Sequence, residues 1–139
     1  MDLTFDSFVL AASTADLGEE PDAREHAAAV EFRMDLADDP LSALDAYEGA
    51  LPIIATNRAR WEGGEADDEG RLDALVAAAE YPSVAAVDVE LASLRDPAGA
   101  EAADAAREAG AAVIASAHDF EGTSPESELR RIVHEAAGR

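Results

Sequence analysis

The chain of 139 residues contains no cysteine and no lysine, and aromatic residues make up only 5% of it. Without cysteine it can form neither disulfide bonds nor thiolate-based sites. Without lysine it has no side-chain amine, and its ten basic residues are all arginines. The scarcity of aromatics and the abundance of alanine predict a core built from small aliphatic side chains.

Positive charge is scarce as well. Aspartate and glutamate number 31 against ten arginines, which gives a formal net charge of −21. A surface of this sign repels nucleic acids and anionic membranes, so neither is expected as a partner. The regular spacing of apolar residues argues against disorder. We interpret the acidity as a surface adapted to a high-salt cytoplasm, where ionic screening weakens self-repulsion.

Long apolar stretches and a signal peptide are also absent, which predicts a soluble cytoplasmic protein. The length is typical of one domain, and no linker-like segment interrupts the chain. We therefore expect a single domain over residues 1–139.

Short apolar runs alternate with helical patterns along the whole chain. The runs at 7–12, 30–36, 52–56, 84–91 and 113–117 predict strands. Helices are expected at 21–28, after Asp39-Pro40, around Leu72–Ala79, from Asp96-Pro97 to Gly110, and after Ser124-Pro125, where Leu129, Ile132, Val133 and Ala136 form the expected core face. Strands that alternate with helices form a parallel sheet with right-handed crossovers.

Charges occupy alternate positions of two predicted strands: Glu31, Arg33 and Asp35 on one, Asp88 and Glu90 on the next but one. Alternate side chains share one side of a strand. Because the other side must face the helices, the charged side faces water or a shared interior, where acids and arginines can pair. This favours part of a (β/α)8 barrel. A full barrel needs about 250 residues and eight units, so five βα units make an incomplete α/β barrel.

The most informative stretch is 111–125, AAVIASAHDFEGTSP, an apolar strand that runs into His118. Barrel enzymes place their chemistry where strands end. A lone histidine there is equally compatible with a structural role and with catalysis. An imidazole exchanges protons near neutral pH, and a carboxylate beside it can fix its tautomer.

Four segments together resemble type I 3-dehydroquinate dehydratases: EFRMD (31–35), TNRARWEGGE (56–65), VDVEL (87–91) and ASAHDFEGTSP (115–125). The resemblance covers nearly the whole chain and corresponds to the N-terminal part of the family. It implies a (β/α)8 barrel, usually a homodimer, with no metal and no organic cofactor. It also implies that a lysine imine, a strand-end histidine and loss of water convert 3-dehydroquinate to 3-dehydroshikimate in the shikimate pathway.

The resemblance assigns residues one at a time. His118 matches the general acid/base, and Glu62 matches the glutamate that lies beside it. Glu31, Arg33, Arg58 and, less closely, Ser13 match residues that bind the substrate. The imine lysine and the later substrate-binding residues would lie beyond Arg139. The chain alone is therefore expected to be inactive, and to form a homo-oligomer or pair with a C-terminal portion.

Two alternatives remain open. The first is a metal-dependent lyase or isomerase with a Mg²⁺ or Mn²⁺ site, whose ligands could be Glu31, Asp35, Glu62, Asp88, Glu90 and His118. The chain could instead be a non-catalytic half-barrel that self-associates through its open sheet edges and binds small carboxylates. Asp88 and Glu90 are interpreted as structural partners of the arginines, and Glu31 with Arg33 could be no more than an internal ion pair.

Overall fold

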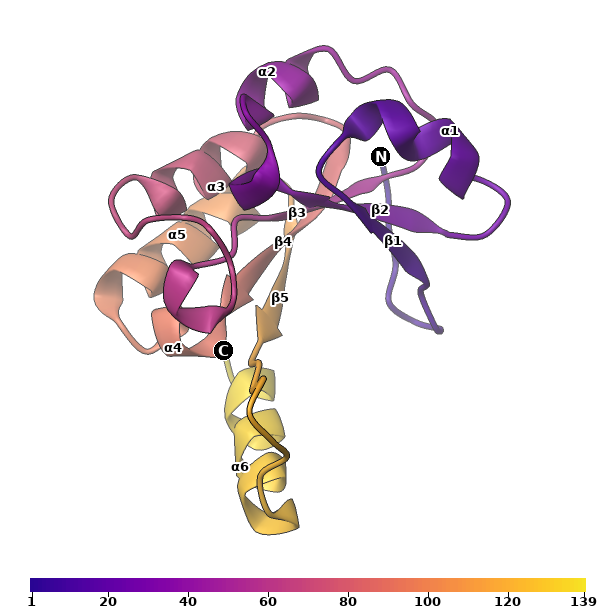
Figure 1. The fold of residues 1–139 in the computed structure, drawn as a ribbon. Helices are drawn as coiled ribbons and strands as arrows, with labels where there is room; N and C mark the ends of the chain where they lie inside the picture. Colours follow the sequence, from indigo (N-terminus) through magenta and orange to yellow (C-terminus); the bar gives the residue numbers. More distant parts are fainter.

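A computed structural model describes residues 1–139, and its centre is one five-stranded parallel sheet in the order β1-β2-β3-β4-β5 (Figure 1). The strands are β1 (Ala11–Thr14), β2 (Ala29–Arg33), β3 (Ile53–Thr56), β4 (Val84–Glu90) and β5 (Ala112–Ser116). Each strand pairs with the next along the chain, as in a (β/α)8 barrel, and β1 and β5 are the two open edges. The predicted set of five parallel βα units is confirmed.

One or two helices follow each strand. They are η1 (Leu17–Glu19), α1 (Glu20–Ala23), η2 (Met34–Leu36), α2 (Pro40–Asp45), η3 (Arg60–Glu62), α3 (Arg71–Ala79), α4 (Leu91–Leu94), α5 (Pro97–Glu108) and α6 (Glu126–Ala137). No helix of the structure has the length and apolar character needed to cross a membrane.

Helix starts follow the sequence signals unevenly. At α2 the expected cap is present, because the Asp39 carboxylate accepts the Ser42 N–H at 3.3 Å. Asp96 precedes Pro97 at the start of α5 as expected, but its side chain makes no capping hydrogen bond. The cap expected from Ser124 is not formed, since Pro125 is the residue that precedes α6.

Three predicted boundaries were wrong. The strand expected at 7–12 is shifted to Ala11–Thr14, because pairing of Ala11 with Ala29 sets its start. The strand expected at 30–36 ends at Arg33, where the chain turns into η2. The helix expected at 21–28 ends at Ala23, and the Ala28 N–H already donates to the Leu10 carbonyl as the chain enters β2. The short helix α4 was not predicted.

The two faces of the sheet differ as the alternating charges predict. The helix side holds the main core, which includes Phe32, Ile53, Val87 and Leu75. On the other face Ala29, Ile54 and Ala86 form a small apolar layer under Leu3 and Val9 of the N-terminal segment. The polar residues lie on this second face and at the carboxyl ends of the strands.

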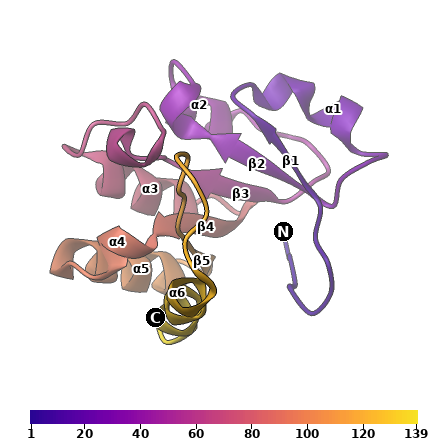
Figure 2. The same ribbon diagram turned by 60° about the horizontal axis from the view of Figure 1, so that its bottom comes forward.

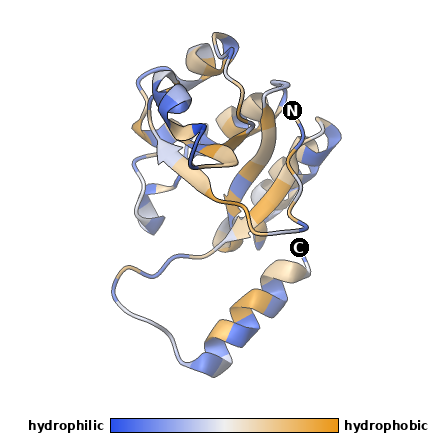
Figure 3. Cartoon of the chain, turned by 90° about the vertical axis from the view of Figure 1, so that its right-hand side faces the viewer, coloured by the Kyte–Doolittle hydropathy of each residue, from blue (hydrophilic) through white to orange (hydrophobic).

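Helix α6 stands apart from the sheet (Figures 1 and 3), and Figure 2 shows it nearly end-on. None of its residues is buried, and Leu129 and Val133 are 41% and 68% exposed. The prediction that its apolar face joins the core is therefore wrong in this chain. An ion pair of 2.8 Å between Arg95 and Glu135 connects it to the end of α4, and this pairing lowers the pKa of Glu135 to about 2.

Phe32 offers a direct test of the helix-side core, since its side chain is fully buried there. We expect Phe32→Ala to lower the free energy of unfolding by about 3–5 kcal/mol, through lost burial and the cavity that remains. The matched control is Phe8→Ala, because Phe8 is 88% exposed and should change stability by no more than about 0.5 kcal/mol. Urea denaturation followed by circular dichroism measures both, and equal effects would contradict this assignment of the core.

Candidate active site

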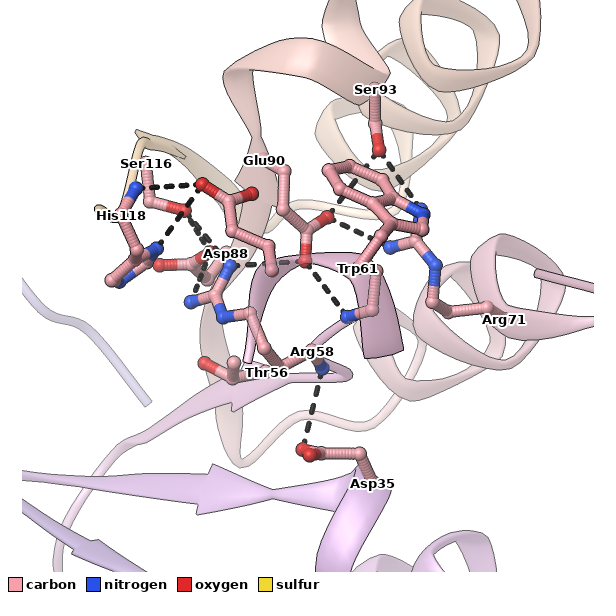
Figure 4. Close-up of polar contacts among 12 residues, drawn as sticks. Asp35, Thr56, Arg58, Trp61, Arg71, Asp88, Glu90, Ser93, Ser116 and His118 are labelled. Carbon is pink, nitrogen blue, oxygen red and sulfur yellow. Dashed lines mark hydrogen bonds and ion pairs between the residues drawn. The ribbon is translucent and has the colours of Figure 1, made fainter. Parts of the chain in front are cut away.

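Polar side chains gather where β2 to β5 end, at the edge of the sheet that barrel enzymes use for chemistry (Figure 4). Parallel strands bring their carboxyl ends to the same edge, so short motifs far apart in sequence meet there. The residues assigned from sequence all lie on β1, on β2 or on the segments after β3 and β5. They are His118, Glu62, Glu31, Arg33, Arg58 and Ser13.

Arg58 is the centre of this group. It follows β3, is 5% exposed, and its Nη2 lies 2.9 Å from Asp88 Oδ1. Its Nη1 donates to Glu90 Oε2 and to Ser116 Oγ, each at 3.0 Å. The side chains of β4 and β5 therefore fix the guanidinium in place. Asp88 and Glu90 partner an arginine, as the sequence indicated.

Asp88 lies in a site that disfavours its charge. Burial raises the pKa of this carboxyl group, against the opposing effects of the Arg58 charge and of the Ser116 hydroxyl, which donates to Oδ1 at 2.6 Å. The nearby charge of Glu90 raises the pKa further. The effects that raise the pKa of Asp88 therefore outweigh those that lower it.

Glu31 joins the first three strands. Its Oε1 accepts from Ser13 Oγ of β1, and its Oε2 accepts from Thr56 Oγ1 of β3, both at 2.9 Å. The structure thus brings Ser13 and Glu31 together. A Glu31–Arg33 ion pair, the structural interpretation of these two residues, is not formed.

Arg33 instead forms a forked pair with Asp35, with distances of 2.9 and 2.8 Å. Asp35 also accepts the backbone N–H groups of Arg58 and Glu65 at 3.3 and 3.1 Å. Burial alone would raise the pKa of Asp35, but the Arg33 guanidinium and these N–H donors outweigh it and hold the pKa below its usual value. Asp35 therefore fastens the segment after β3 to the end of β2.

His118 and Glu62 lie next to each other although 56 residues separate them. The His118 backbone N–H donates to Glu62 Oε1 at 2.6 Å, and His118 Nδ1 lies 3.5 Å from the same oxygen. The Phe120 ring stacks on the imidazole with centroids 5.9 Å apart and planes 5° from parallel. With Nδ1 facing the carboxylate, Nε2 is the nitrogen left for a substrate.

Two glycines shape the segment that carries Glu62. Gly63 has a φ of +86°, a left-handed conformation that glycine adopts without strain. Gly64 packs so closely against the chain that a Cβ there would lie 2.1 Å from the Arg58 carbonyl oxygen. Its N–H donates to the Ala59 carbonyl at 2.9 Å. The glycine pair allows the tight turn that places Glu62 against His118.

The acids of the metal alternative are distributed among the arginines. Asp35 pairs with Arg33, and Asp88 and Glu90 pair with Arg58. No group of three or more histidine, aspartate or glutamate side chains is placed to hold a metal ion.

Sequence reasoning missed several groups of this edge, among them Ser116, Arg71 and the backbone N–H of Ala59, which donates to Glu90 Oε2 at 3.2 Å. Arg71 begins α3, and its Nη1 donates to Glu90 Oε1 at 2.8 Å. An arginine at the first position of a predicted helix gives no signal of its own, because arginine is a common surface residue of helices.

Gly64 allows a test of how the segment is held. In Gly64→Ala the added Cβ would meet the Arg58 backbone, so residues 59–66 must move away from β3. Trp61 lies in this segment and is the chain's one tryptophan. We expect its fluorescence to shift to longer wavelength and the melting temperature to fall.

The control for this substitution is Gly122→Ala, since a Cβ at Gly122 has no heavy atom within 4 Å. It should leave both signals unchanged. An unaltered Trp61 spectrum in Gly64→Ala would show that the close approach to Arg58 is not required.

Comparison with solved structures shows the same fold. The chain superposes on a 3-dehydroquinate dehydratase from Geobacillus kaustophilus with a TM-score of 0.80 and 22% sequence identity, over 96% of this chain and 58% of that chain. The structure of the enzyme of the same name from Enterococcus faecalis gives a TM-score of 0.72 and 21% identity, over 91% of this chain and 62% of that chain.

Relatives found by sequence share a higher identity with this chain than these solved structures do. A protein named 3-dehydroquinate dehydratase from Halobacterium salinarum is 54% identical over 96% of this chain, and one from Haloarcula marismortui is 56% identical over 87%. The chain spans 61% and 55% of the lengths of these two relatives. The family model described as type I 3-dehydroquinase matches residues 8–139. On this match, and with relatives of such identity, the chain belongs to the type I 3-dehydroquinase family.

Proposed function

We propose that this chain supplies the proton-transfer half of a lyase that dehydrates 3-dehydroquinate to 3-dehydroshikimate. The observation that carries the proposal is the contact of His118 with Glu62, in which Nδ1 lies 3.5 Å from the carboxylate and Nε2 has no protein partner. Membership of the type I family supports the choice of reaction.

In this reaction His118 carries the proton. Nε2 removes a proton from the carbon beside the substrate carbonyl, and the same proton then leaves with the departing hydroxyl group as water. The Glu62 carboxylate keeps the Nδ1–H tautomer in place and stabilises the imidazolium that forms between the two steps. Phe120, stacked on the ring, limits its rotation.

The substrate is a polyhydroxylated carboxylate, and the residues at the strand ends suit it. Arg33 and Arg58 can bind a carboxylate or hydroxyl oxygens with fixed donors. Glu31 and Ser13, already hydrogen-bonded to each other, offer acceptors and a donor for hydroxyl groups. In this proposal no metal and no organic cofactor takes part.

A lysine is the part of the reaction that this chain lacks. In the type I family a lysine forms an imine with the substrate ketone. The chain's one primary amine is that of Met1, which is bonded to the Pro82 carbonyl just before β4, at the opposite end of the sheet from His118. We therefore propose that the lysine comes from further βα units.

The open side of the molecule suits such units. The strand edges β1 and β5 have no second neighbour, and unpaired edges favour pairing with another strand. A cavity of about 480 Å³ lies between α6 and the end of β5, lined by Leu91, Ala115, Ile132 and Val133 among others. Further units in the same polypeptide or in a second one would cover these surfaces. A second copy of this chain is the alternative occupant, as in a self-associating half-barrel.

Reduction of the imine tests the origin of the amine. Treating the 139-residue chain with 3-dehydroquinate and borohydride should leave no substrate adduct in the site, because no lysine is present. The chain completed with the three C-terminal βα units of the Halobacterium salinarum relative should gain one adduct, located by mass spectrometry on a lysine of the added units. An adduct near His118 in the short chain, or none in the completed one, would contradict the proposal.

Replacement of the histidine tests the proton carrier. In the completed enzyme we expect His118→Ala to lower kcat by about 10²- to 10⁴-fold, the usual contribution of general acid/base catalysis. The control is His26→Ala, because His26 is exposed and outside the site. Equal kcat values for the two variants would show that His118 does not carry the proton.

A further inference from the structure

Arg71 is an arginine of the outer helix layer that turns inward. It begins α3, yet its side chain is only 4% exposed. Nη1 donates to Glu90 Oε1 at 2.8 Å, and Nη2 donates to Ser93 Oγ at 2.9 Å. Figure 4 shows it on the side of Glu90 away from Arg58. Arg71 is not among the residues matched to the family's site.

Glu90 lies between two guanidinium groups. Its Oε1 faces Arg71 and its Oε2 faces Arg58, while its own side chain is 1% exposed. Together with Asp88, the buried group contains two positive and two negative charges. Burial of a carboxylate is costly unless a cation compensates it. Without Arg71, Arg58 would be the one cation for two buried carboxylates.

Trp61 covers the outer side of Arg71. Its ring lies 5.6 Å from Arg71 Cζ, within the range of a cation–π contact. The indole Nε1–H donates to Asp68 at 2.8 Å. Because Glu62 follows directly, this stack also holds the segment that carries Glu62. The Asn57 amide adds a second connection by donating to the Arg71 carbonyl at 3.1 Å.

We propose that Arg71 is a positioning residue of this site. It compensates the charge of Glu90, and Glu90 in turn holds Arg58 and the Ala59 N–H in place. Because Arg71 neutralises Glu90, the positive charge of Arg58 stays available to an anionic ligand. Trp61 shields this ion pair from water. The inference rests on the proposed function only in taking the ligand to be a carboxylate.

The first test follows the carboxyl groups and needs no substrate. In Arg71→Met the stem still packs but the cation is lost, so the pair Asp88–Glu90 should bind a proton at a pH about one unit or more higher than in the unchanged chain. The sign follows because loss of a cation destabilises the anionic form. The other groups that face the pair stay in place: Arg58, Arg33, Ser93, Ser116 and the Ala59 N–H. Carbon-13 carboxyl shifts of the 139-residue chain measure the titration.

Two further variants separate charge from packing. Arg71→Lys restores the cation and should return most of the shift. Arg130→Met, an equal loss of charge from an exposed pair with Glu126 on α6, should produce none. No shift in Arg71→Met, or the same shift in Arg130→Met, would overturn the proposal.

If Arg71→Met fails to fold, a double variant decides the question. Arg71→Met/Glu90→Gln removes both partners of the ion pair at once. If Arg71 acts by compensating Glu90, the double variant folds with a smaller loss of stability than Arg71→Met alone. A double variant that is equally destabilised would assign Arg71 a packing role and overturn the proposal.

Kinetics of the completed enzyme give the last readout. Arg71→Met should raise KM for the carboxylate substrate about tenfold, the loss expected when one charge-assisted contact is weakened, and leave kcat within about twofold, since it acts through Arg58 on binding. A fall in kcat with KM unchanged would contradict this. Should the completed enzyme show no dehydratase activity, the proposed function fails, while the carboxyl titration still decides the role of Arg71.

Discussion

A buried positive charge at the carboxyl ends of three neighbouring strands is the constraint on which this structure depends. The Arg58 guanidinium is almost fully buried and bonded to Asp88 and Glu90 of β4 and to Ser116 of β5. A buried charge is tolerated only where its partners are close and well oriented. The strands that supply these partners must therefore keep their register, and the packing of the helix-side core provides that register.

The same constraint extends to the segment after β3. Asp35 holds the backbone N–H of Arg58 and of Glu65, while Glu90 holds the N–H of Ala59. These bonds and the closely packed Gly64 leave the segment little freedom. Glu62, which contacts His118, is consequently held in a fixed position, although the histidine itself lies on an exposed segment after β5. The ion pairs are thus as important for the position of Glu62 and His118 as for stability.

Much of this could be predicted from sequence, and the limits have physical causes. Alternating charges indicated which face of the sheet is polar, and the resemblance to the type I family implied that Glu62 lies beside His118. Which acid pairs with which arginine could not be predicted, because Glu31 and Arg33 lie on one face, yet Arg33 turns to Asp35 where the strand ends. The apolar stripe of α6 predicted burial and was wrong in this chain, because within these residues no surface covers it.

Arg71 and Trp61 show how a site can depend on residues that no strand-end pattern indicates. Periodicity reports which face of a helix is apolar, and Arg71 begins a helix whose apolar positions are Leu72, Leu75 and Val76. Its long stem lets the guanidinium reach Glu90 from the helix layer, beyond the local spacing that a pattern can detect. The indole of Trp61 then takes the place of water above it. A charge balance at a barrel mouth can therefore be set from the layer outside the barrel, and substitutions in that layer can change ligand affinity without touching the ligand.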